Sequence, residues 1–475
     1  MNVNLTNFSA KNFGVIHFCG IGGIGMSGIA EILANMGCDV QGSDISENNN
    51  IARLKSLNVK IFIGQAEENI MGASVVIRSS AIRDDNIEVV EARKNNIPVI
   101  ARADMLKEIM RLKNSVTIAG THGKTTTTSM IAELFESAGL EPTVINGGIL
   151  NSCNTNAYLG SGDWIVAEAD ESDGSFNKLP AEVAVVTNID PEHIEFYGNF
   201  ENLRKAFLNF VEKVPFYGFA VLCNDHMIVK NIISEIKDRR IISYGFADDS
   251  MVRGVNLRPH NEGYLFDVAI KLKDVNNYIR DIYLPMYGKH NVQNALAAIS
   301  VGVGFGVSEK ILKLFLENFL GVKRRLTKVE TGLDIMIIDD YGHHPTEIRA
   351  SISAVNDIKK ENLDGELIVI VQPHRYSRVY NLFSEFSNAF VDADKVFVTD
   401  IYAAGEDEIP GINKESLALE IEKNSDVKVF QISNLNNLDL YLKGHIKKKD
   451  ILLFLGAGDI TRYANELPGK LKKII

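Results

Sequence analysis

Short apolar runs alternate with longer mixed stretches through most of the chain. In the N-terminal part, the runs GVIHFC, VKIFIG, ASVVIRSSAI and IPVIA predict buried strands, and the stretches between them predict helices. Strands that alternate with helices are typical of a parallel sheet with helices on its faces. The pattern therefore predicts an α/β fold.

The same alternation returns in the middle of the chain and again in its C-terminal part, where MIIDD, LIVIV, VFVT and ILLFLG are the apolar runs. A chain of 475 residues is longer than one hydrophobic core usually supports. We expect three α/β domains: a Rossmann-like domain at 1–112, a central phosphate-loop (P-loop) ATPase domain at 113–321, and a C-terminal Rossmann-like domain at 322–475.

The segment SVTIAGTHGKTTTT, residues 115–128, predicts a strand, a tight loop and a helix. Backbone N–H groups of the loop, the helix dipole and the charge of Lys124 would together hold a phosphate. Thr125, directly after the lysine, is placed to ligate magnesium. The usual phosphate loop has four residues between its glycines, whereas only Thr121 and His122 separate Gly120 from Gly123 here. The alternative is a glycine-rich turn with a surface lysine.

A second glycine loop follows the first predicted strand, with the pattern Gly20-x-Gly22-x-x-Gly25. This arrangement suits a phosphate or pyrophosphate, and Asp44 at the end of the next strand is a candidate for a ribose hydroxyl. One alternative is that the glycines serve only close packing of helix on strand. Another is a dehydrogenase, which the second phosphate loop disfavours because such enzymes do not need it.

Acidic residues end two central strands, in WIVAEADESD and AEVAVVTNIDPEH. Parallel strands bring their carboxyl ends to one crevice, so Glu168 and His193 are expected near the ion held by Thr125. Carboxylates are ordinary magnesium ligands and histidine is less so, which leaves a histidine bonded within its loop as the alternative. Farther along, Asn291 and Asn294 begin a helix that is expected to face an adenine ring, with capping by Asn291 as the alternative.

Two basic, aromatic segments follow strands of the C-terminal part, DDYGHHP and QPHRYSR. Positive groups beside Tyr341 suit a small carboxylate such as an amino acid. The alternatives are metal ligation or helix capping for His343 and His344, and a solvated basic face for the second segment.

Composition excludes few functions. The net charge of −11 argues against non-specific nucleic-acid binding. The four cysteines show no paired metal spacing, which fits a reduced, cytoplasmic setting. The start of the chain lacks the features of a signal peptide, and no apolar run is long enough to predict a membrane span. We expect no nucleic-acid partner, no membrane insertion, and a monomer or homodimer.

Taken together, the motifs resemble the Mur ligases, the ATP-dependent amide-forming enzymes of peptidoglycan synthesis. The resemblance covers nearly the whole chain and rests on GIGGIGMSG, GTHGKTTT, EADESD, HNVQNALAA, DDYGHHPTE, QPHRYSR and GAGDI. The family's own phosphate signature, GTxGKT, accounts for the short spacing of Gly120 and Gly123. A folylpolyglutamate synthase-like ligase is a further alternative, which the extra first domain disfavours.

The resemblance implies ATP and Mg2+ as cofactors, and UDP-N-acetylmuramate and L-alanine as substrates. It implies that the sugar-nucleotide carboxylate becomes an acyl phosphate, which the amine of alanine then attacks. Sister enzymes that add later amino acids carry a carbamylated lysine, whose place falls near Phe207, with no lysine in register. This departure favours the alanine-adding members and leaves the number of magnesium ions open.

The resemblance also assigns residues to roles. For catalysis and metal binding it implies Lys124, Thr125, Glu168 and His193. For ATP it implies Gly120, Thr121, His122, Gly123, Lys124, Thr125, Thr126, Asn291, Asn294, Arg325 and Asp340. For the UDP-sugar it implies Gly22, Gly23, Ile24, Gly25, Met26, Ser27, Asp44 and Ser80. For the amino acid it implies Tyr341, His343, His374, Arg375 and Arg378.

Overall fold

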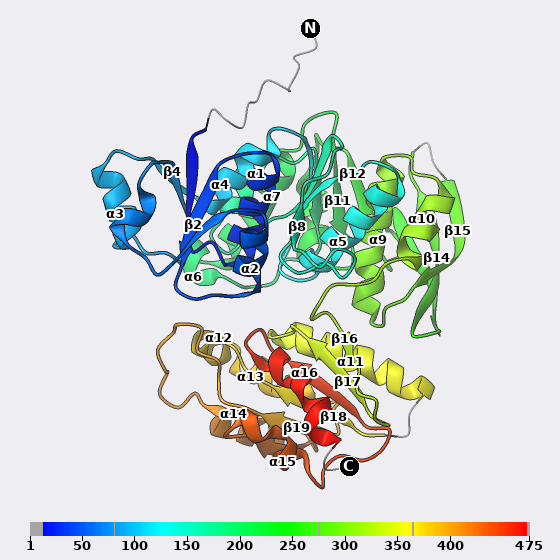
Figure 1. The fold of residues 1–475 in the computed structure, drawn as a ribbon. Helices are drawn as coiled ribbons and strands as arrows, with labels where there is room; N and C mark the ends of the chain where they lie inside the picture. The colour runs from blue at the N-terminus through cyan, green and yellow to red at the C-terminus, as the bar shows by residue number, and fades with distance from the viewer. Residues whose placement is uncertain (1–12, 80, 274–275, 363–364, 473–475) are drawn as a thin grey trace. The chain divides into compact units, whose positions relative to one another are not determined.

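The computed structural model describes residues 13–79, 81–273, 276–362 and 365–472. The chain divides into two compact units (Figure 1). One unit comprises residues up to 255 together with 267–282 and 293–320, and the other comprises 256–266, 283–292 and the chain from 321 onward. The described strands form three sheets, each largely parallel and flanked by helices, and the predicted α/β class is confirmed.

The first sheet has five strands, all paired in parallel, in the order β3-β2-β1-β4-β5. The strands are β1 (Val15–Cys19), β2 (Val40–Asp44), β3 (Lys60–Ile63), β4 (Ala73–Arg78) and β5 (Val99–Ala101). The helices are α1 (Ile24–Asn35), α2 (Asn49–Ser56), α3 (Ile87–Lys94) and α4 (Arg102–Met110), with a 3-10 turn at Glu67–Ile70. Parallel strands place the loops that follow them at one edge, where the first glycine loop lies.

A fully buried carboxylate, Glu88, lies at the start of α3 against the first sheet. Its Oε2 accepts hydrogen bonds from His17 Nε2 at 3.2 Å, Cys19 Sγ at 3.0 Å and Ser43 Oγ at 2.6 Å. Its Oε1 accepts one from Asn69 Nδ2 at 2.7 Å. Burial alone would raise the pKa of Glu88, but these donors lower it to about 2. The carboxylate is therefore ionised inside the core, with its partners built into the fold.

Helix α1 packs closely on the short strand β8 (Ala157–Tyr158) within the first unit. A Cβ on Gly28 would lie 2.8 Å from Ala157 Cβ and 2.9 Å from Asn156 Nδ2. The same Asn156 Nδ2 donates to the carbonyl oxygen of Ile24 at 2.7 Å. Gly28 is therefore required for the close approach of two elements, as the packing alternative for these glycines expects, and it lies beyond the glycine loop itself.

The central sheet has the order β15-β14-β13-β12-β11-β10-β6-β9-β7-β8. Its strands besides β8 are β6 (Asn114–Ala119), β7 (Thr143–Ile145), β9 (Trp164–Glu168), β10 (Val183–Val186), β11 (Phe219–Cys223), β12 (Ile241–Gly245), β13 (Val252–His260), β14 (Gly263–Lys271) and β15 (Asn276–Leu284). Its helices are α5 (Lys124–Ser137), α6 (Ile194–Tyr197), α7 (Phe200–Glu212), α8 (Met227–Glu235), α9 (Lys289–Gly304) and α10 (Glu309–Glu317), with a 3-10 turn at Ser175–Lys178. Strands β12 to β7 pair in parallel, as the alternation of strands and helices predicts.

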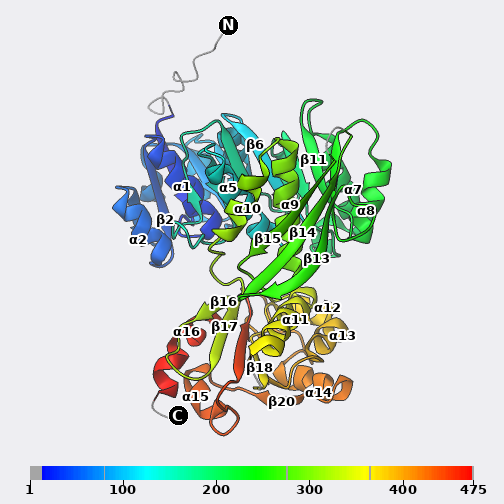
Figure 2. The same cartoon turned by 90° about the vertical axis from the view of Figure 1, so that its right-hand side faces the viewer.

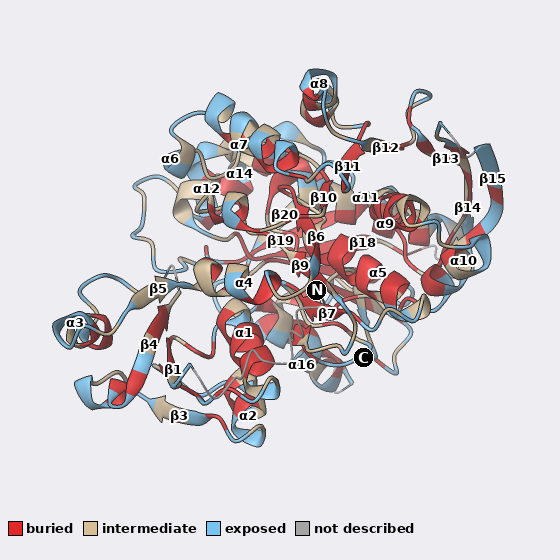
Figure 3. Ribbon diagram, turned by 90° about the horizontal axis from the view of Figure 1, so that it is seen from above, coloured by how far each residue is buried: buried red, intermediate tan, exposed pale blue. Residues whose placement is uncertain are grey.

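Strands β13, β14 and β15 extend this sheet side by side (Figure 2) and were not predicted from the sequence. The turn at Asn261 and Glu262, both with positive φ, joins the first two of them and is the available local signal. Figure 3 shows that β6, β9 and β10 are buried, whereas β15 is largely exposed. A half-exposed strand carries polar residues and lacks the continuous apolar run of a buried one, which explains why β15 was missed. Strand β14 is mostly buried and apolar, so this reason does not apply to it.

Phe207 on α7 is a core residue of the central part. Its ring is fully buried and lies 4.9 Å from that of Phe176, between centroids. The place at which sister enzymes are expected to carry a carbamylated lysine is thus filled by an aromatic side chain in the core. In the part of the chain that the structure describes, no helix is both long and apolar enough to cross a membrane.

The third sheet has six strands in the order β16-β17-β21-β18-β19-β20, and all pair in parallel except β16 on β17. The strands are β16 (Thr327–Val329), β17 (Met336–Asp340), β18 (Leu367–Val371), β19 (Lys395–Val398), β20 (Lys428–Gln431) and β21 (Ile451–Leu455). The helices are α11 (Pro345–Asn362), α12 (Tyr376–Asn381), α13 (Phe383–Ser387), α14 (Lys414–Asn424), α15 (Leu438–Leu442) and α16 (Ile460–Leu471), with 3-10 turns at Asn388–Phe390 and Leu435–Asn437. Helices α11 and α16 lie on opposite sides of the sheet (Figure 2), and α16 closes a core of isoleucines, leucines and Phe454.

Candidate active site

The phosphate-loop segment has the predicted geometry, because β6 ends at Ala119 and α5 begins at Lys124. Gly120 and Gly123 have φ of 138° and 81°, which favour glycine. A Cβ on Gly120 would lie 2.0 Å from Thr187 Oγ1, and one on Gly123 would lie 2.6 Å from Asn294 Oδ1. Both glycines are therefore required by conformation and by space, and the loop is a built structure.

Lys124 is held inside the loop and is fully paired. Its Nζ donates to the carbonyl oxygens of Gly120 at 2.5 Å and Thr121 at 3.1 Å, and lies 2.9 Å from Glu171 Oε2. Burial lowers the pKa of Lys124, but the charges of Glu171 and Glu168 outweigh it, so the pKa is raised overall. The surface-lysine alternative is wrong, because the side chain is 15% exposed and pairs with the buried Glu171, which follows β9.

Glu171 is the partner that the sequence did not identify. Its side chain is 4% exposed, and burial raises its pKa to about 7 although Lys124 acts in the opposite direction. The carboxyl group is thus close to its protonation midpoint at neutral pH. The cation that favours its charged form is Lys124.

Asn188 and Asp190, which follow β10, fix the shape of the loop. Asn188 Oδ1 accepts from the His122 N–H at 2.7 Å, and Asn188 O accepts from the Thr121 N–H at 3.1 Å. Asp190 Oδ2 lies 3.3 Å from His122 Nε2, and its Oδ1 lies 3.3 Å from His226 Nε2. Although burial acts in the other direction, these histidines hold the pKa of Asp190 well below its usual value. The residues after β10 therefore hold the phosphate loop in its conformation.

The three predicted metal ligands differ in how well they suit magnesium. Glu168 lies at the end of β9, where Oε2 accepts from the Gly147 N–H at 2.8 Å and Oε1 accepts no hydrogen bond from the described residues. His193 precedes α6 with a φ of 56°, and burial lowers its pKa below the usual value, which favours the neutral ring. Glu168 with the Thr125 hydroxyl fits a magnesium ion, whereas the His193 nitrogen is a less usual ligand.

The expected adenine contacts lie on α9, with Thr126 buried on the facing helix α5. Asn294 Oδ1 accepts from Thr127 Oγ1 at 3.2 Å, next to Gly123. Asn291 lies inside the first turn and donates from Nδ2 to the Tyr287 carbonyl at 2.8 Å. The capping alternative for Asn291 is wrong, because the helix already begins at Lys289.

The first glycine loop, Gly20 to Gly25, is held by its own part of the chain. Asp44 Oδ2 accepts from the Gly22 N–H at 2.8 Å, and Asn50 Nδ2 donates to the Gly22 carbonyl at 2.9 Å. Asp44 therefore fixes the loop with the oxygen that was expected to reach a ribose. Gly23 precedes α1, and Ile24 and Gly25 open it, where backbone N–H groups have no acceptor within the helix.

The remaining predicted UDP-sugar residues are divided. Met26 and Ser27 are buried, and Ser27 Oγ donates back to the Ile24 carbonyl at 3.1 Å. These two side chains therefore support the helix start, and their role toward a ligand stays a prediction. Ser80 lies outside the described residues.

The five predicted amino-acid residues come together in the second unit. Ring centroids lie 5.3 Å apart for Tyr341 and His343, and 5.7 Å apart for His343 and His374. Arg378 Nη1 donates to the His374 carbonyl at 3.3 Å. Burial lowers the pKa of His374 to about 3, and the neighbouring His343, Arg378 and Arg375 act in the same direction, so the His374 ring is neutral at pH 7.

Two residues around this cluster were missed by sequence reasoning. Tyr402 stacks on His374, with centroids 5.5 Å apart and an interplanar angle of 7°. Glu406 accepts from the Ser377 N–H and hydroxyl, and its Oε1 lies 4.0 Å from Arg375 Nε. Both follow β19, and no local signal distinguished them in a loop of mixed composition.

Arg325 and Asp340, the predicted ATP residues of this unit, lie beside the same cluster. The Arg325 guanidinium is 5.3 Å from the centroid of the Tyr341 ring. Asp340 accepts from the N–H groups of Leu326 and Gly342, both at 2.8 Å, and from Ser351 Oγ at 2.9 Å. Asp340 therefore organises the turn after β17 before any ribose is bound.

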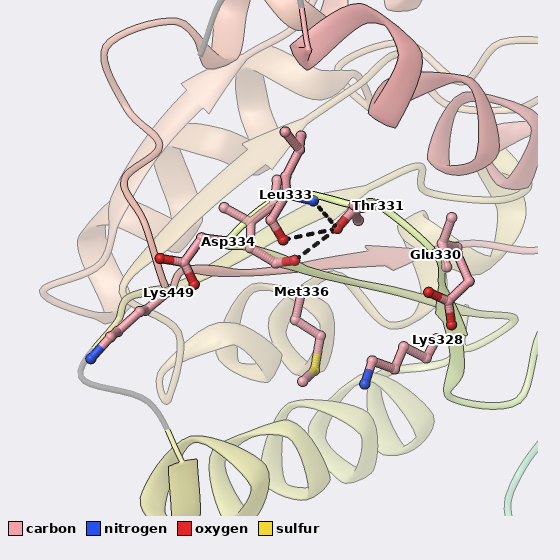
Figure 4. Close-up of a pocket in the computed structure, with 10 residues that line it drawn as sticks. Lys328, Glu330, Thr331, Leu333, Asp334, Met336 and Lys449 are labelled. Carbon is pink, nitrogen blue, oxygen red and sulfur yellow. Dashed lines mark hydrogen bonds between the residues drawn. The ribbon is translucent and has the colours of Figure 1, made fainter.

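A pocket of about 290 Å³ lies elsewhere in this unit, at the turn between β16 and β17 (Figure 4). Lys328, Glu330, Asp334 and Lys449 line it, and the Thr331 hydroxyl bonds to Leu333 within the turn. It opens at the amino end of β17, whereas the predicted residues follow the carboxyl end. The pocket contains none of the predicted site residues.

The fold and the loops define a class of protein: α/β chains with a phosphate loop in a central sheet, preceded by a Rossmann-like sheet and followed by a second one. Family models agree in each part. The Mur ligase family catalytic domain matches residues 15–114, the Mur ligase middle domain matches 118–302, and the Mur ligase glutamate ligase domain matches 324–458. The chain belongs to the Mur ligase family.

The relatives are similar over nearly their whole length. A UDP-N-acetylmuramate–L-alanine ligase from Rhodospirillum centenum is 50% identical over 97% of this chain and 95% of its own. One from Brucella anthropi is 50% identical over 97% of this chain and 98% of its own. The solved UDP-N-acetylmuramate–alanine ligase of Thermotoga maritima is 28% identical, with a TM-score of 0.81 over 97% of this chain and 99% of its own. A murein peptide ligase from Psychrobacter arcticus, at 22% identity and a TM-score of 0.70, shares the fold.

Proposed function

We propose that this chain joins L-alanine to the lactyl carboxylate of UDP-N-acetylmuramate at the expense of ATP, giving UDP-N-acetylmuramoyl-L-alanine, ADP and phosphate. The observation that carries the proposal is the preformed loop around Lys124, found in a chain whose relatives at 50% identity are named for this reaction. Because the chain belongs to the Mur ligase family and its relatives at 50% identity are named for alanine addition, we favour this reaction over the dehydrogenase and the folylpolyglutamate synthase-like ligase.

The proposed reaction has two chemical steps. A carboxylate is a poor electrophile, so one of its oxygens first attacks the γ-phosphorus of ATP, and the bond from phosphorus to the ADP oxygen breaks. The amine nitrogen of alanine then attacks the acyl carbon of the acyl phosphate. The tetrahedral intermediate collapses as the bond to phosphate breaks, and the nitrogen loses its proton.

Phosphoryl transfer depends on positioning and charge neutralisation more than on covalent help from the protein. Gly120 to Thr125 supply backbone N–H groups and the charge of Lys124. Lys124 pairs with Glu171 in the folded chain. To hold the triphosphate, the lysine would exchange this carboxylate for phosphate oxygens. Neutral His374 and the guanidinium groups of Arg375 and Arg378 are assigned to alanine, with an arginine on its carboxylate.

Magnesium would be held by Thr125 and Glu168, with His193 as a third ligand nearer the acyl group. A bound magnesium ion would neutralise negative charge on the phosphate oxygens during transfer. The cytoplasmic location, and the choice between monomer and homodimer, stay predictions.

The proposal is tested by ATP-dependent phosphate release with UDP-N-acetylmuramate and L-alanine, glycine, L-serine or a tripeptide as the acceptor. L-Alanine should give the highest kcat/KM. Glycine should be about 10- to 100-fold poorer, because one methyl group is worth roughly 1–3 kcal/mol. Preference for the tripeptide would assign the chain to peptide addition instead, and no release with any acceptor would favour a non-catalytic nucleotide-binding regulator.

The alanine pocket has its own test. Arg378→Ala should raise the KM for alanine about 10- to 100-fold, because a hydrogen bond to a charged group contributes about 1.5–3 kcal/mol. The KM for ATP should change little. Arg349→Ala, at an exposed arginine on α11, is the matched control. If both KM values rise together, the pocket is misassigned.

A further inference from the structure

Arg102 is a cation at the sheet edge where the first glycine loop lies, and the reaction scheme above does not use it. It is the first residue of α4, directly after β5, and its side chain is 21% exposed. A Cβ on Gly25 would lie 3.0 Å from Arg102 Nη1 and 3.3 Å from its Cδ. The side chain therefore lies across the start of α1, in close contact with the space that a side chain at position 25 would take.

The guanidinium is held at one end and open at the other. Its Nη2 lies 3.3 Å from Asp170 Oδ2, and its other N–H groups donate no hydrogen bond to the described residues. A guanidinium carries five N–H donors in a planar fork that matches phosphate oxygens. Asp170 itself is 47% exposed, and although burial acts in the other direction, hydrogen bonds from Ser172 and the charge of Arg102 lower its pKa.

Other arginines of this part of the chain are engaged differently. Arg53 is bonded at two positions, with Nε 2.9 Å from Glu31 and Nη2 3.0 Å from Asn156. Arg78 Nη1 donates to the Ile82 carbonyl and lies 3.2 Å from Asp84. Arg102 combines a fixed position over the glycine loop with unused donors, which is what an anion-binding residue requires.

Resting on the proposed function, we propose that Arg102 binds the diphosphate of the sugar nucleotide, and that Asp170 is a positioning residue that holds the guanidinium over Gly25. Asp170 belongs to the acidic segment that also carries Glu171, the partner of Lys124. One side chain thereby connects the sugar-nucleotide loop to the segment that lines the phosphate loop, within the same compact unit.

The test measures dissociation constants of UDP, UDP-N-acetylmuramate and ADP by calorimetry on the full chain. Arg102→Ala should weaken UDP and UDP-N-acetylmuramate by the same factor, about 10- to 100-fold, and leave ADP unchanged. Arg102→Lys should recover part of the loss, because it restores the charge but not the fork. Asp104→Asn is the control: Asp104 pairs at 3.2 Å with Lys178 and ties the same helix without facing the glycine loop.

Asp170→Asn tests whether Asp170 acts by positioning the Arg102 guanidinium or by contacting the nucleotide itself. It should weaken UDP severalfold, and the double variant Arg102→Ala with Asp170→Asn should bind no more weakly than Arg102→Ala alone. Additive losses would overturn the positioning role.

The outcomes distinguish the inference from the proposed function. Wild-type affinity of Arg102→Ala for UDP overturns the inference alone. A loss confined to UDP-N-acetylmuramate also overturns it, because the guanidinium would then hold the carboxylate. A wild-type chain that binds neither uridine nucleotide overturns both, since the proposed sugar-nucleotide site would be absent.

Discussion

Two buried glutamates, Glu88 and Glu171, have opposite surroundings. Glu88 accepts hydrogen bonds from three side chains of the first sheet and from Asn69 on the 3-10 turn, and its pKa is lowered to about 2. Glu171 faces one cation, Lys124, and its pKa is raised to about 7 by burial. The partners of Glu88 are parts of strands and of a 3-10 turn, whereas the partner of Glu171 is the lysine that we propose to hold a phosphate. We therefore expect the first site to stabilise the fold and the second site to exchange its partner.

The surroundings of His17 show how the first site is built. Gln41 Nε2 lies 3.4 Å from His17 Nδ1, on the side of the ring away from Glu88. Two of the four partners are contacted by a further residue, because Gln41 also donates to the Asn69 carbonyl at 2.8 Å. Among the described residues, Lys124 Nζ is held, besides Glu171, by two carbonyl groups of its own loop.

The largest effect is expected for Glu88→Gln. An amide places N–H donors where other donors already point, so the free energy of unfolding should fall by about 3 kcal/mol or more. Urea unfolding at pH 7 measures it. Glu68→Gln, at an exposed position on the neighbouring 3-10 turn, should change stability by less than about 0.5 kcal/mol. A cost below 1 kcal/mol for Glu88→Gln would show that the four donors do not stabilise the charge.

The pH dependence of the same pair gives a second test. The folded pKa of Glu88 is lowered from 4.5 to about 2, so its contribution is present above about pH 4.5 and is lost as the pH falls toward 2. The difference in unfolding free energy between wild type and Glu88→Gln should shrink by up to about 3 kcal/mol over that range. A difference that stays constant from pH 7 to pH 3 would contradict the lowered pKa.

A smaller effect is expected at the second site. Glu171→Gln should change the free energy of unfolding by less than about 1 kcal/mol at pH 7, because the pKa of about 7 leaves the carboxyl group about half in its neutral form, which the amide resembles. The sign also follows from pH: the folded pKa is raised, so the contribution of Glu171 is present below pH 4.5 and is lost as the pH rises through 7. ADP affinity should not weaken, since phosphate no longer competes with the carboxylate for Lys124. A stability loss as large as that of Glu88→Gln would remove the contrast.

Much of this architecture was predictable from the sequence. Buried parallel strands are continuous apolar runs, and the chemical residues at their carboxyl ends, such as Lys124 after β6 and Glu168 on β9, come together because such strands share one edge of the central sheet. The largely exposed strand β15 lacks that signal. The partners of the site were also missed, because Arg102 and Asp170 are 68 residues apart and meet only through the order of the strands.

Residue type alone left two uses open for some residues. Asp44 and Asp340 have the chemistry to bind a ribose, and both also accept hydrogen bonds from backbone N–H groups of their own turns. An aspartate after a strand serves equally well to fix a turn. Spacing in the sequence does not distinguish the two uses, and the hydrogen bonds of the folded chain do.

The central claim is that Lys124 leaves Glu171 to hold the phosphate that ATP transfers. The most direct measurement is phosphate release by Lys124→Ala with UDP-N-acetylmuramate and L-alanine, beside the UDP-N-acetylmuramate dissociation constant of the same variant. Lys205→Ala, at a lysine on α7 that is 60% exposed, is the control. The account predicts at least about a 100-fold loss of release with sugar-nucleotide affinity unchanged. Release at the wild-type rate by Lys124→Ala would contradict it.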